Sequence, residues 1–310
     1  MFYNYCTKLS IYFSLFCFVT ITGNGFSQNS DTIKKVNFGI RKALVIGVTS
    51  TYTAGSLLYL NYIWYKPYRT SSFHFYDDNS EWCQMDKCGH VFTTYNTGRL
   101  MTQAMQRAGF KSRKSILIGE TYGTIYMTTV EVMDGFSSGW GFSWGDELAN
   151  VSGSALFALQ QYFWKEQRLQ LKFSFHQSPY AKYRPSELGG DLSQQIIKDY
   201  NGQSYWLSLN ISSFLKKKNN FPKWLNLAFG YGAEDMISGQ DNYYITTLDG
   251  KNIGKNRYRK LYFSLDVDLT KIKTKSVFLK TIFSIFNSFK VPFPTVEFNK
   301  NGITAHPFFL

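Results

Sequence analysis

Four segments in the second half of the chain alternate apolar and polar residues, and this pattern constrains the fold more than any other feature. They lie at residues 169–175, 205–211, 225–231 and 261–269. Alternation over such lengths predicts antiparallel strands with one apolar face. Each segment is also close to the length of a membrane-spanning strand.

Two weaker strands are expected near the end of the chain, at 295–299 and 303–310. Pro307 cannot donate to a strand ladder, so the last of them should lie at a sheet edge. Apolar residues at helical spacing beside lysines fill positions 278–289. They fit a basic helix at a membrane surface, and equally a surface helix that covers the sheet.

The first half of the chain has helical patterning. Residues 43–65 form an uncharged segment. As a helix, this segment is long enough to cross a hydrocarbon layer. Its Gly, Ser, Thr and Tyr content favours packing against other helices. Three further helices are expected at 86–107, 112–134 and 143–164, the last with Ser143 as its N-cap.

The predicted fold class is therefore α+β. A bundle of about four apolar helices precedes an antiparallel, amphipathic β-sheet with four clear strands and up to six. We expect a helical, membrane-associated part over residues 28–166 and a β-rich part, packed on it, over 167–310.

The start of the chain predicts export. Lys8 precedes an apolar stretch at 11–22, and the small residues Gly25 and Ser27 fit a signal-peptidase site. We therefore expect a signal peptide over residues 1–27. Cys17 lacks the small residues that precede a lipidation site, so no lipid anchor is predicted. The strands favour the outer membrane over the inner membrane or the periplasm.

Composition points to a membrane and argues against nucleic acid as a partner. Aromatic residues make up 18% of the chain and charged residues only 18%, as suits a lipid-facing surface. The net charge of +13 comes from short basic runs such as Lys216-Lys217-Lys218. These runs fit solvated loop ends or contacts with anionic lipid phosphates. The expected partners are a membrane lipid or another envelope protein.

Two cysteines, Cys83 and Cys88, follow the expected signal peptide. A disulfide requires Cys83 to lie outside the helix, because a five-residue offset would point the two side chains apart. Two free, buried thiols are the alternative.

Polar residues occur in pairs at one-turn spacing within the three later helices, so each pair lies on one helix face. The pairs are Asp86 with His90, Glu131 with Asp134, and Asp146 with Asn150. The sequence around them is largely apolar. Three such pairs facing one another can bind a metal, shuttle a proton or hold a polar headgroup.

Structural explanations compete with a chemical site. Asp146 follows Ser143 by three residues and can complete a capping box. Asp86 can be the N-cap of its helix. Asp134 is harder to explain this way, because a carboxylate near a helix C-terminus opposes the helix dipole. The pairs can also form a polar network that locks the helices together.

Several motifs carry a resemblance to a known family. They are Trp82-x-x-Met-Asp-Lys-x-Gly-His90, Thr-Val-Glu131-Val-Met-Asp134-Gly-Phe-Ser, Trp144-Gly-Asp-x-x-Ala-Asn150-x-x-Gly153, Lys198-Asp-Tyr-Asn-Gly-Gln-x-Tyr-Trp206 and Leu265-Asp-Val-Asp-Leu-Thr-Lys271. Together they resemble the domain-of-unknown-function 2279 family of Gram-negative envelope proteins, some described as predicted periplasmic lipoproteins. The resemblance implies an envelope location and no particular activity. The helical part is also faintly similar to VanZ-like membrane proteins.

Two functional hypotheses follow. The first is a noncatalytic envelope component that binds lipid or a partner protein, with the polar pairs locking its helices. The second is a membrane-embedded hydrolase or transferase acting on an envelope lipid or cell-wall precursor. There His90 would be the general base, oriented by Asp86, and the metal ligands or acid partners would be Glu131, Asp134 and Asp146. The motifs of common hydrolases and nucleotide-binding proteins are absent from the sequence.

Overall fold

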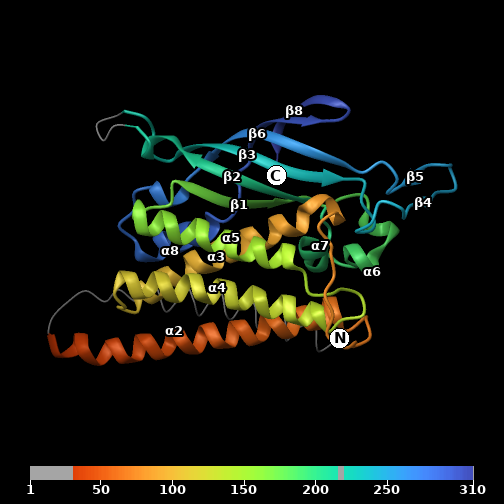
Figure 1. Cartoon of the computed structure of the whole chain (residues 1–310). Coiled ribbons are helices and arrows are strands. Elements are labelled where there is room, and N and C mark those ends of the chain that lie inside the picture. Colours follow the sequence, from red (N-terminus) through yellow and green to blue (C-terminus); the bar gives the residue numbers. More distant parts are fainter. Residues whose placement is uncertain (1–30, 216–219, 310) are drawn as a thin grey trace.

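The computed structural model describes residues 31–215 and 220–309. The expected signal peptide over 1–27 and the basic run Lys216-Lys217-Lys218 lie outside these residues. The chain forms a helical half followed by a β-rich half, which confirms the α+β class (Figure 1).

Four long helices form the first half. They are α2 (Asp31–Leu60), which continues into the π-helical turn η1 (Asn61–Tyr65), α3 (Met85–Arg107), α4 (Ser112–Gly135) and α5 (Trp144–Phe163). The last three match their predicted ranges within one residue at each end. Helix α2 lies along α4, and hydroxyl pairs such as Thr53 with Tyr122 join the two. Within the described residues, the segment Gly39–Tyr65 is long and apolar enough to cross a membrane, with a mean hydropathy of 1.4.

The second half is built around one antiparallel sheet. Its strands are β1 (Leu169–Phe175), β2 (Gln203–Asn210), β3 (Leu225–Glu234), β6 (Tyr258–Val267), β7 (Phe293–Asn299) and β8 (Gly302–Phe309), in the spatial order β1-β2-β3-β6-β7-β8. All six expected strands are present, and Pro307 lies on an edge strand, as predicted. A separate two-stranded ribbon contains β4 (Ile245–Thr246) and β5 (Asn252–Ile253).

Shorter helices complete the fold. They are η2 (Glu81–Gln84), η3 (Ala181–Tyr183), α6 (Pro185–Leu188), α7 (Leu192–Lys198), η4 (Ile211–Ser213), η5 (Leu269–Lys271) and α8 (Val277–Phe286).

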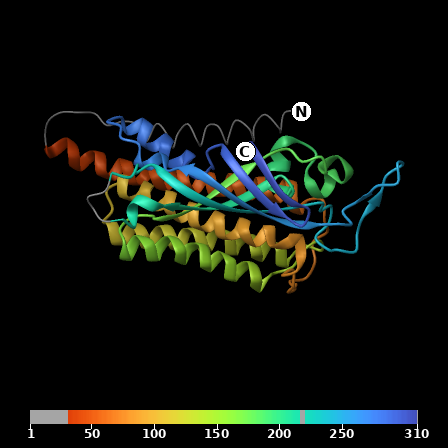
Figure 2. The same ribbon diagram turned by 90° about the horizontal axis from the view of Figure 1, so that it is seen from above.

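The two halves meet where β1 and β2 lie against α3. Phe92 of α3 packs on the rings of Phe173 and Tyr205, and Asn96 donates to the Leu171 carbonyl oxygen at 3.0 Å. The strands that follow lie progressively farther from the helices (Figure 1). From above, the strands slant across the helices (Figure 2). The helices therefore cover only the β1–β2 side of the apolar sheet face.

The rest of the sheet has its polarity reversed relative to a sheet in a water-soluble protein. The buried side chains of the central strands are polar or small, including Ser208, Asn226 and Asp266, all 0% exposed. Their apolar neighbours point outward, and Phe229 and Leu261 are 50% and 58% exposed. In water, antiparallel sheets place the apolar face inward. Here the apolar face of β3, β6 and β7 forms the outer surface.

The sheet is strongly curled around its polar face. Lys172 on β1 forms an ion pair with Asp266 on β6 at 2.6 Å, and both side chains are 0% exposed. These strands are three strand spacings apart, or about 14 Å in a flat sheet. Phe309 on β8 likewise reaches Trp206 on β2. Contact between such distant strands requires the polar side to be concave.

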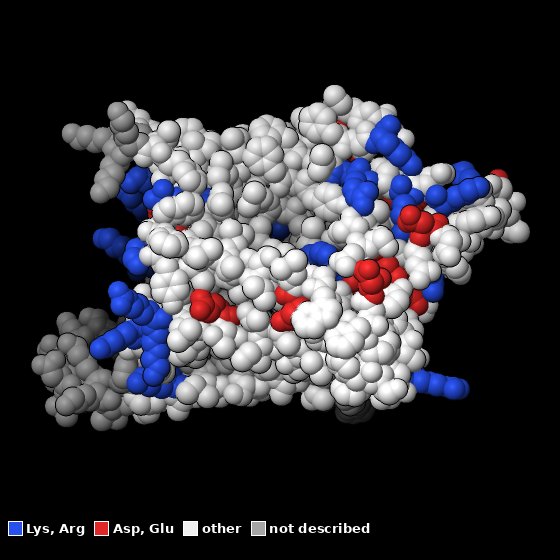
Figure 3. All heavy atoms as spheres, in the orientation of Figure 1, with Lys and Arg blue, Asp and Glu red and all other residues white. Residues whose placement is uncertain are grey.

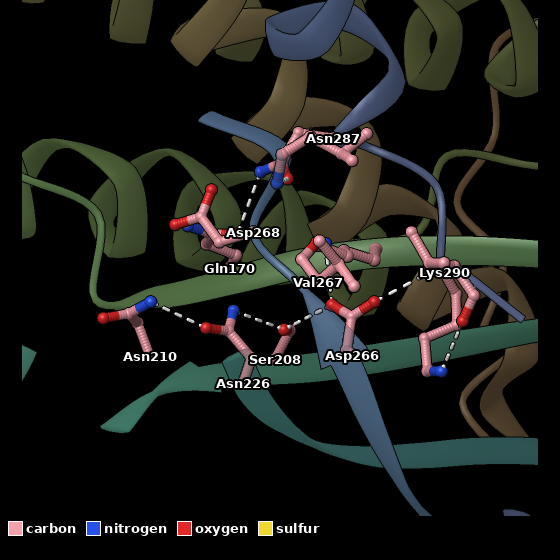
Figure 4. A network of polar contacts seen from close by, with 12 residues as sticks. Gln170, Ser208, Asn210, Asn226, Asp266, Val267, Asp268, Asn287 and Lys290 are labelled. Atoms are coloured by element: carbon pink, nitrogen blue, oxygen red, sulfur yellow. Dashed lines mark hydrogen bonds and ion pairs between the residues drawn. The ribbon is translucent and has the colours of Figure 1, made fainter. Parts of the chain in front are cut away.

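Hydrogen bonds fill this concave face (Figure 4). A chain of side chains runs from Asn210 through Asn226 and Ser208 to Asp266, with donor–acceptor distances of 2.6–2.8 Å. The Lys172 ammonium also donates to the Val267 carbonyl oxygen at 2.6 Å. Gly230 leaves room for the Trp206 ring, which an added Cβ would approach to 2.7 Å. The small residues of β3 therefore make room for a side chain from the neighbouring strand β2, and not for a helix.

Helix α8 repeats the reversed polarity. Thr281 and Ser284 are buried, whereas Val277, Phe278 and Phe286 are exposed. The inward face receives hydrogen bonds from α3, because Arg99 donates to the Ser284 carbonyl and hydroxyl oxygens at 3.0 and 3.1 Å. Phe278 and Phe286 of the apolar stripe therefore point outward, whereas Phe289, at the end of the predicted stripe, contacts Phe173 of β1.

We predict that the buried ion pair of the sheet is essential to its stability. Lys172→Met leaves Asp266 as an uncompensated buried charge, which should cost about 3–5 kcal/mol. Lys271→Met removes a partly exposed ion pair with Glu166 and should cost about 1 kcal/mol or less. Thermal unfolding in mild detergent measures both. Equal losses in the two variants would contradict the prediction.

Candidate functional site

The predicted polar pairs converge at one end of the helical bundle, where α3 and α5 begin and α4 ends. Helix α3 supplies Asp86 and His90, α4 supplies Glu131, and α5 supplies Asp146 and Asn150. All five side chains are at least largely buried, and Asn150 is 0% exposed. Asp134 lies at the border of the cluster, beside Tyr65 of η1.

A glycine allows α3 and α5 to come close enough for this site to form. A Cβ added at Gly153 would lie 2.1 Å from Thr94 Oγ1 and 2.3 Å from the Val91 carbonyl oxygen. Only glycine fits so close an approach of two helices. The approach brings Asn150 of α5 next to His90 of α3.

A left-handed turn sets the direction in which α3 begins. Trp82, Cys83 and Gln84 have φ values of 47°, 52° and 62°, a region that costs L-residues about 1–2 kcal/mol each. The β-rich half holds this turn, because Trp82 N donates to the Gly239 carbonyl oxygen and Tyr231 Oη to the Cys83 carbonyl oxygen.

The position of this turn bears on two predictions, the N-cap role of Asp86 and the pairing of Cys83 with Cys88. Gln84 precedes the helix, so Asp86 lies in the first turn of α3 and is not its N-cap. Its carboxylate is therefore available to the cluster. Cys83 lies outside α3, yet Cys83 and Cys88 are free thiols.

Lys87 provides a cation at the centre of three aspartates. Its ammonium lies 2.5 Å from Asp78 Oδ1, 3.0 Å from Asp86 Oδ2 and 2.9 Å from Asp146 Oδ1. The Ser143 hydroxyl also donates to Asp78 Oδ1, at 2.6 Å. Asp78 and Lys87 were not among the predicted site residues, although Lys87 lies within the Asp-Lys-x-Gly-His motif.

The pKa of Asp78, in the loop before η2, reflects these contacts. Burial raises this pKa, but hydrogen bonds with Asp146, Lys87 and Ser143 outweigh that effect. Together they hold the pKa below its ordinary value of 3.8.

The catalytic hypothesis assumed that Asp86 orients His90. In the structure Asn150 orients it instead. His90 Nδ1 lies 3.0 Å from Asn150 Oδ1. The Asn150 amide is fixed in turn, since its Nδ2 donates to Glu147 Oε2 at 3.2 Å. His90 Nδ1 therefore carries the donated proton, and Nε2 faces Glu131 Oε1 at 3.5 Å and Asp146 Oδ1 at 3.9 Å.

The capping box expected at the start of α5 forms only in part. Ser143 is the N-cap, and its hydroxyl accepts a hydrogen bond from Asp146 N at 3.2 Å. The Ser143 backbone N–H donates to Glu131 Oε2 at 3.3 Å, which is the contact that the Asp146 carboxylate would make in a capping box. Asp146 instead turns its carboxylate toward Lys87 and His90.

Negative charge is in excess at this site. Within the described residues the cluster holds one lysine and six carboxylates, on Asp78, Asp86, Glu131, Asp134, Asp146 and Glu147. No hydrogen-bond donor in this part of the chain reaches Asp86 Oδ1 or Glu131 Oε1, and both atoms are buried. Buried carboxylates in such an arrangement need protons or a further cation.

The fold and the site together define an α+β protein with a polar interior and a carboxylate-rich cluster at one end of its helices. Residues 74–162 match the family model described as "Predicted periplasmic lipoprotein (DUF2279)". The match confirms the predicted resemblance over a segment that contains α3, α4, all of α5 except Phe163, and the whole cluster. It supports an exported, envelope location. No curated protein matches the chain, and no solved structure does.

We expect Asp78 to make stability depend on pH at the acidic end. Because its pKa is lower in the folded state, its contribution is present above the ordinary value of 3.8 and is lost as pH falls through the folded value. Asp78→Asn should lower the unfolding temperature at pH 7 and flatten its decline below about pH 4.

The exposed neighbour Asp77 gives the control variant, Asp77→Asn. Unfolding temperatures of both variants between pH 7 and pH 3 test the prediction. A decline in Asp78→Asn as steep as that of the wild type would contradict it.

Proposed function

We propose that the protein is a noncatalytic component of an envelope membrane, with the outer membrane preferred. In this proposal its apolar outer surface contacts lipid, and its polar interior binds the headgroup of an envelope lipid. The reversed polarity of the sheet is the observation that carries the proposal.

An exposed apolar sheet face is unfavourable in water, and large exposed apolar patches mark contact with a membrane or a partner. The outward side chains Phe229, Leu261 and Phe263 belong to two adjacent strands and form one surface. Membrane-spanning strands have the same division, with apolar residues toward lipid and polar residues inside. A lipid environment therefore removes the cost of this surface.

The helices extend this apolar surface. Leu148, Val151 and Leu159 of α5 are exposed, as are Leu117 and Ile125 of α4. Lysine and arginine gather at the two ends of the molecule, and the face between them is mostly uncharged apart from a few acidic and basic groups (Figure 3). A weakly charged band between two basic ends suits a protein with lipid around its middle.

A polar cavity of about 200 Å³ lies between the helices and the sheet, near the end of α3. Its lining is rich in amides and includes Asn96, Gln103, Gln170, Asn287 and Arg99. Arg99 is 5% exposed, and its hydrogen-bond acceptors within the described chain are all neutral oxygens. A buried guanidinium favours an anionic partner. The phosphate of a lipid headgroup therefore fits this cavity best.

We predict that the outer sheet face contacts acyl chains. A nitroxide label at Phe229→Cys, in a variant whose native cysteines are serine, should be accessible to oxygen and shielded from a water-soluble nickel chelate in liposomes. The same label at Lys251→Cys, on the exposed β4–β5 ribbon, should show the opposite preference. Equal accessibility of the two sites to the nickel chelate would refute a lipid-facing sheet.

We also predict that an anionic phospholipid stays bound to protein extracted in mild detergent. Native mass spectrometry should detect it in the wild type and lose it in Arg99→Gln, because the cavity then has no guanidinium. Arg107→Gln is the matched control, since Arg107 also contacts α8, through Thr281, but does not line the cavity. Equal retention in both variants would argue against this cavity as the lipid site.

A further inference from the structure

We propose that His90, Glu131 and Asp146 bind a divalent transition-metal ion, for which Zn²⁺ is the reference. This site lies at the opposite end of α3 from the headgroup cavity, about 25 Å along the helix from Asp86 to Gln103. The proposal does not depend on lipid binding, and it rests on the geometry of three side chains from three helices.

The donor atoms have nearly the spacing that a metal requires. His90 Nε2 lies 3.5 Å from Glu131 Oε1 and 3.9 Å from Asp146 Oδ1, and the three donor atoms all lie within 4.8 Å of one another. Bond lengths of about 2.0–2.2 Å in tetrahedral zinc sites place ligand atoms about 3.3–3.6 Å apart. Small side-chain movements are enough to close the triad around an ion.

The atoms that face one another all carry lone pairs. With the proton of His90 on Nδ1, toward Asn150, Nε2 presents a lone pair to Glu131 Oε1. Glu131 is 1% exposed, and among the described residues no hydrogen-bond donor reaches its Oε1. Three acceptors directed at one small volume repel one another unless a proton or a cation lies between them, and a divalent cation can satisfy all three at once.

The neighbouring triad shows what a satisfied arrangement looks like. Asp78, Asp86 and Asp146 also form a group with metal-like spacing, but the Lys87 ammonium is bound among them. The protein thus supplies its own cation to one triad. Asp146 belongs to both, so it can bridge the ammonium and a metal. A divalent ion would offset much of the negative charge that Lys87 leaves unbalanced.

The proposed ligands are already oriented by outer hydrogen bonds. Asn150 fixes the His90 ring, and Glu147 fixes the Asn150 amide. The Ser143 N–H holds Glu131 Oε2, which leaves Oε1 for the ion. Metal sites use such partners to set the tautomer and direction of their ligands. The imidazole favours zinc and related ions over Mg²⁺ or Ca²⁺, and three protein ligands leave a position open.

Zinc binding by the detergent-extracted full chain tests the proposal. The protein is stripped with a chelator and titrated with Zn²⁺, and bound metal is counted by mass spectrometry. We expect one tightly bound Zn²⁺ per chain, with affinity at least about tenfold weaker in Glu131→Gln and in His90→Gln. The matched control is Glu120→Gln, which changes a carboxylate of α4 about 16 Å along the helix from Glu131. This variant should bind zinc as the wild type does.

Two results would overturn the site: a stripped wild type that takes up no zinc, or a Glu131→Gln variant with unchanged affinity. Because a buried substitution can prevent folding, the wild type is also loaded with Co²⁺. A visible spectrum of tetrahedral cobalt with nitrogen and oxygen ligands supports the proposal. The spectrum of hydrated cobalt alone would refute it without any variant.

Discussion

The fully buried ion pair between Lys172 and Asp266 requires the β-rich half to curl. Two charges removed from water are tolerated only when each is paired and further hydrogen-bonded, and here Ser208 and the Val267 carbonyl oxygen complete the arrangement. Because the pair joins strands three positions apart, it draws the polar face inward. The apolar side chains of β3 and β6 are then directed outward. The ion pair thus requires the curvature that directs these side chains outward, and backbone hydrogen bonds of Phe173 with Ser288 and Lys290 join β1 to the segment before β7.

Polar side chains of helix α3 contact both the β-rich half and the other helices. At its end, Arg99 binds Ser284 of α8, and at its start, Lys87 and His90 enter the carboxylate cluster. Lipid is as apolar as leucine, so hydrophobic burial cannot hold helices together in a membrane; close packing and hydrogen bonds do so instead. Gly153 provides the packing and Asn150 a hydrogen bond. A polar central helix therefore fits the proposed membrane environment.

The boundaries of helices and strands could be predicted because hydrophobic periodicity and capping residues depend on the local sequence. Alternation in residues 261–269 marks a strand whichever face is buried, and Ser143 marks a helix start through its own backbone contact. Which face is buried depends on the surroundings. Lys172 and Asp266, alternating with apolar residues, fit a solvated face equally well, and their contact appears only once the sheet curls. The outward stripe of α8 was open to two interpretations for the same reason.

The site could be predicted in part, because residues one turn apart share a helix face wherever that helix packs. This rule placed His90 on one helix face with Asp86, and Asp146 with Asn150. It does not predict which of these residues contact one another across helices. The partner of His90 is Asn150, sixty positions away, and Asp78 arrives from a loop without periodicity. The left-handed turn at Trp82–Gln84 contains no glycine, so no local signal predicts it. Yet this turn, held by Gly239 and Tyr231, sets the direction of α3. The geometry of the carboxylate cluster therefore depends on contacts made by the β-rich half.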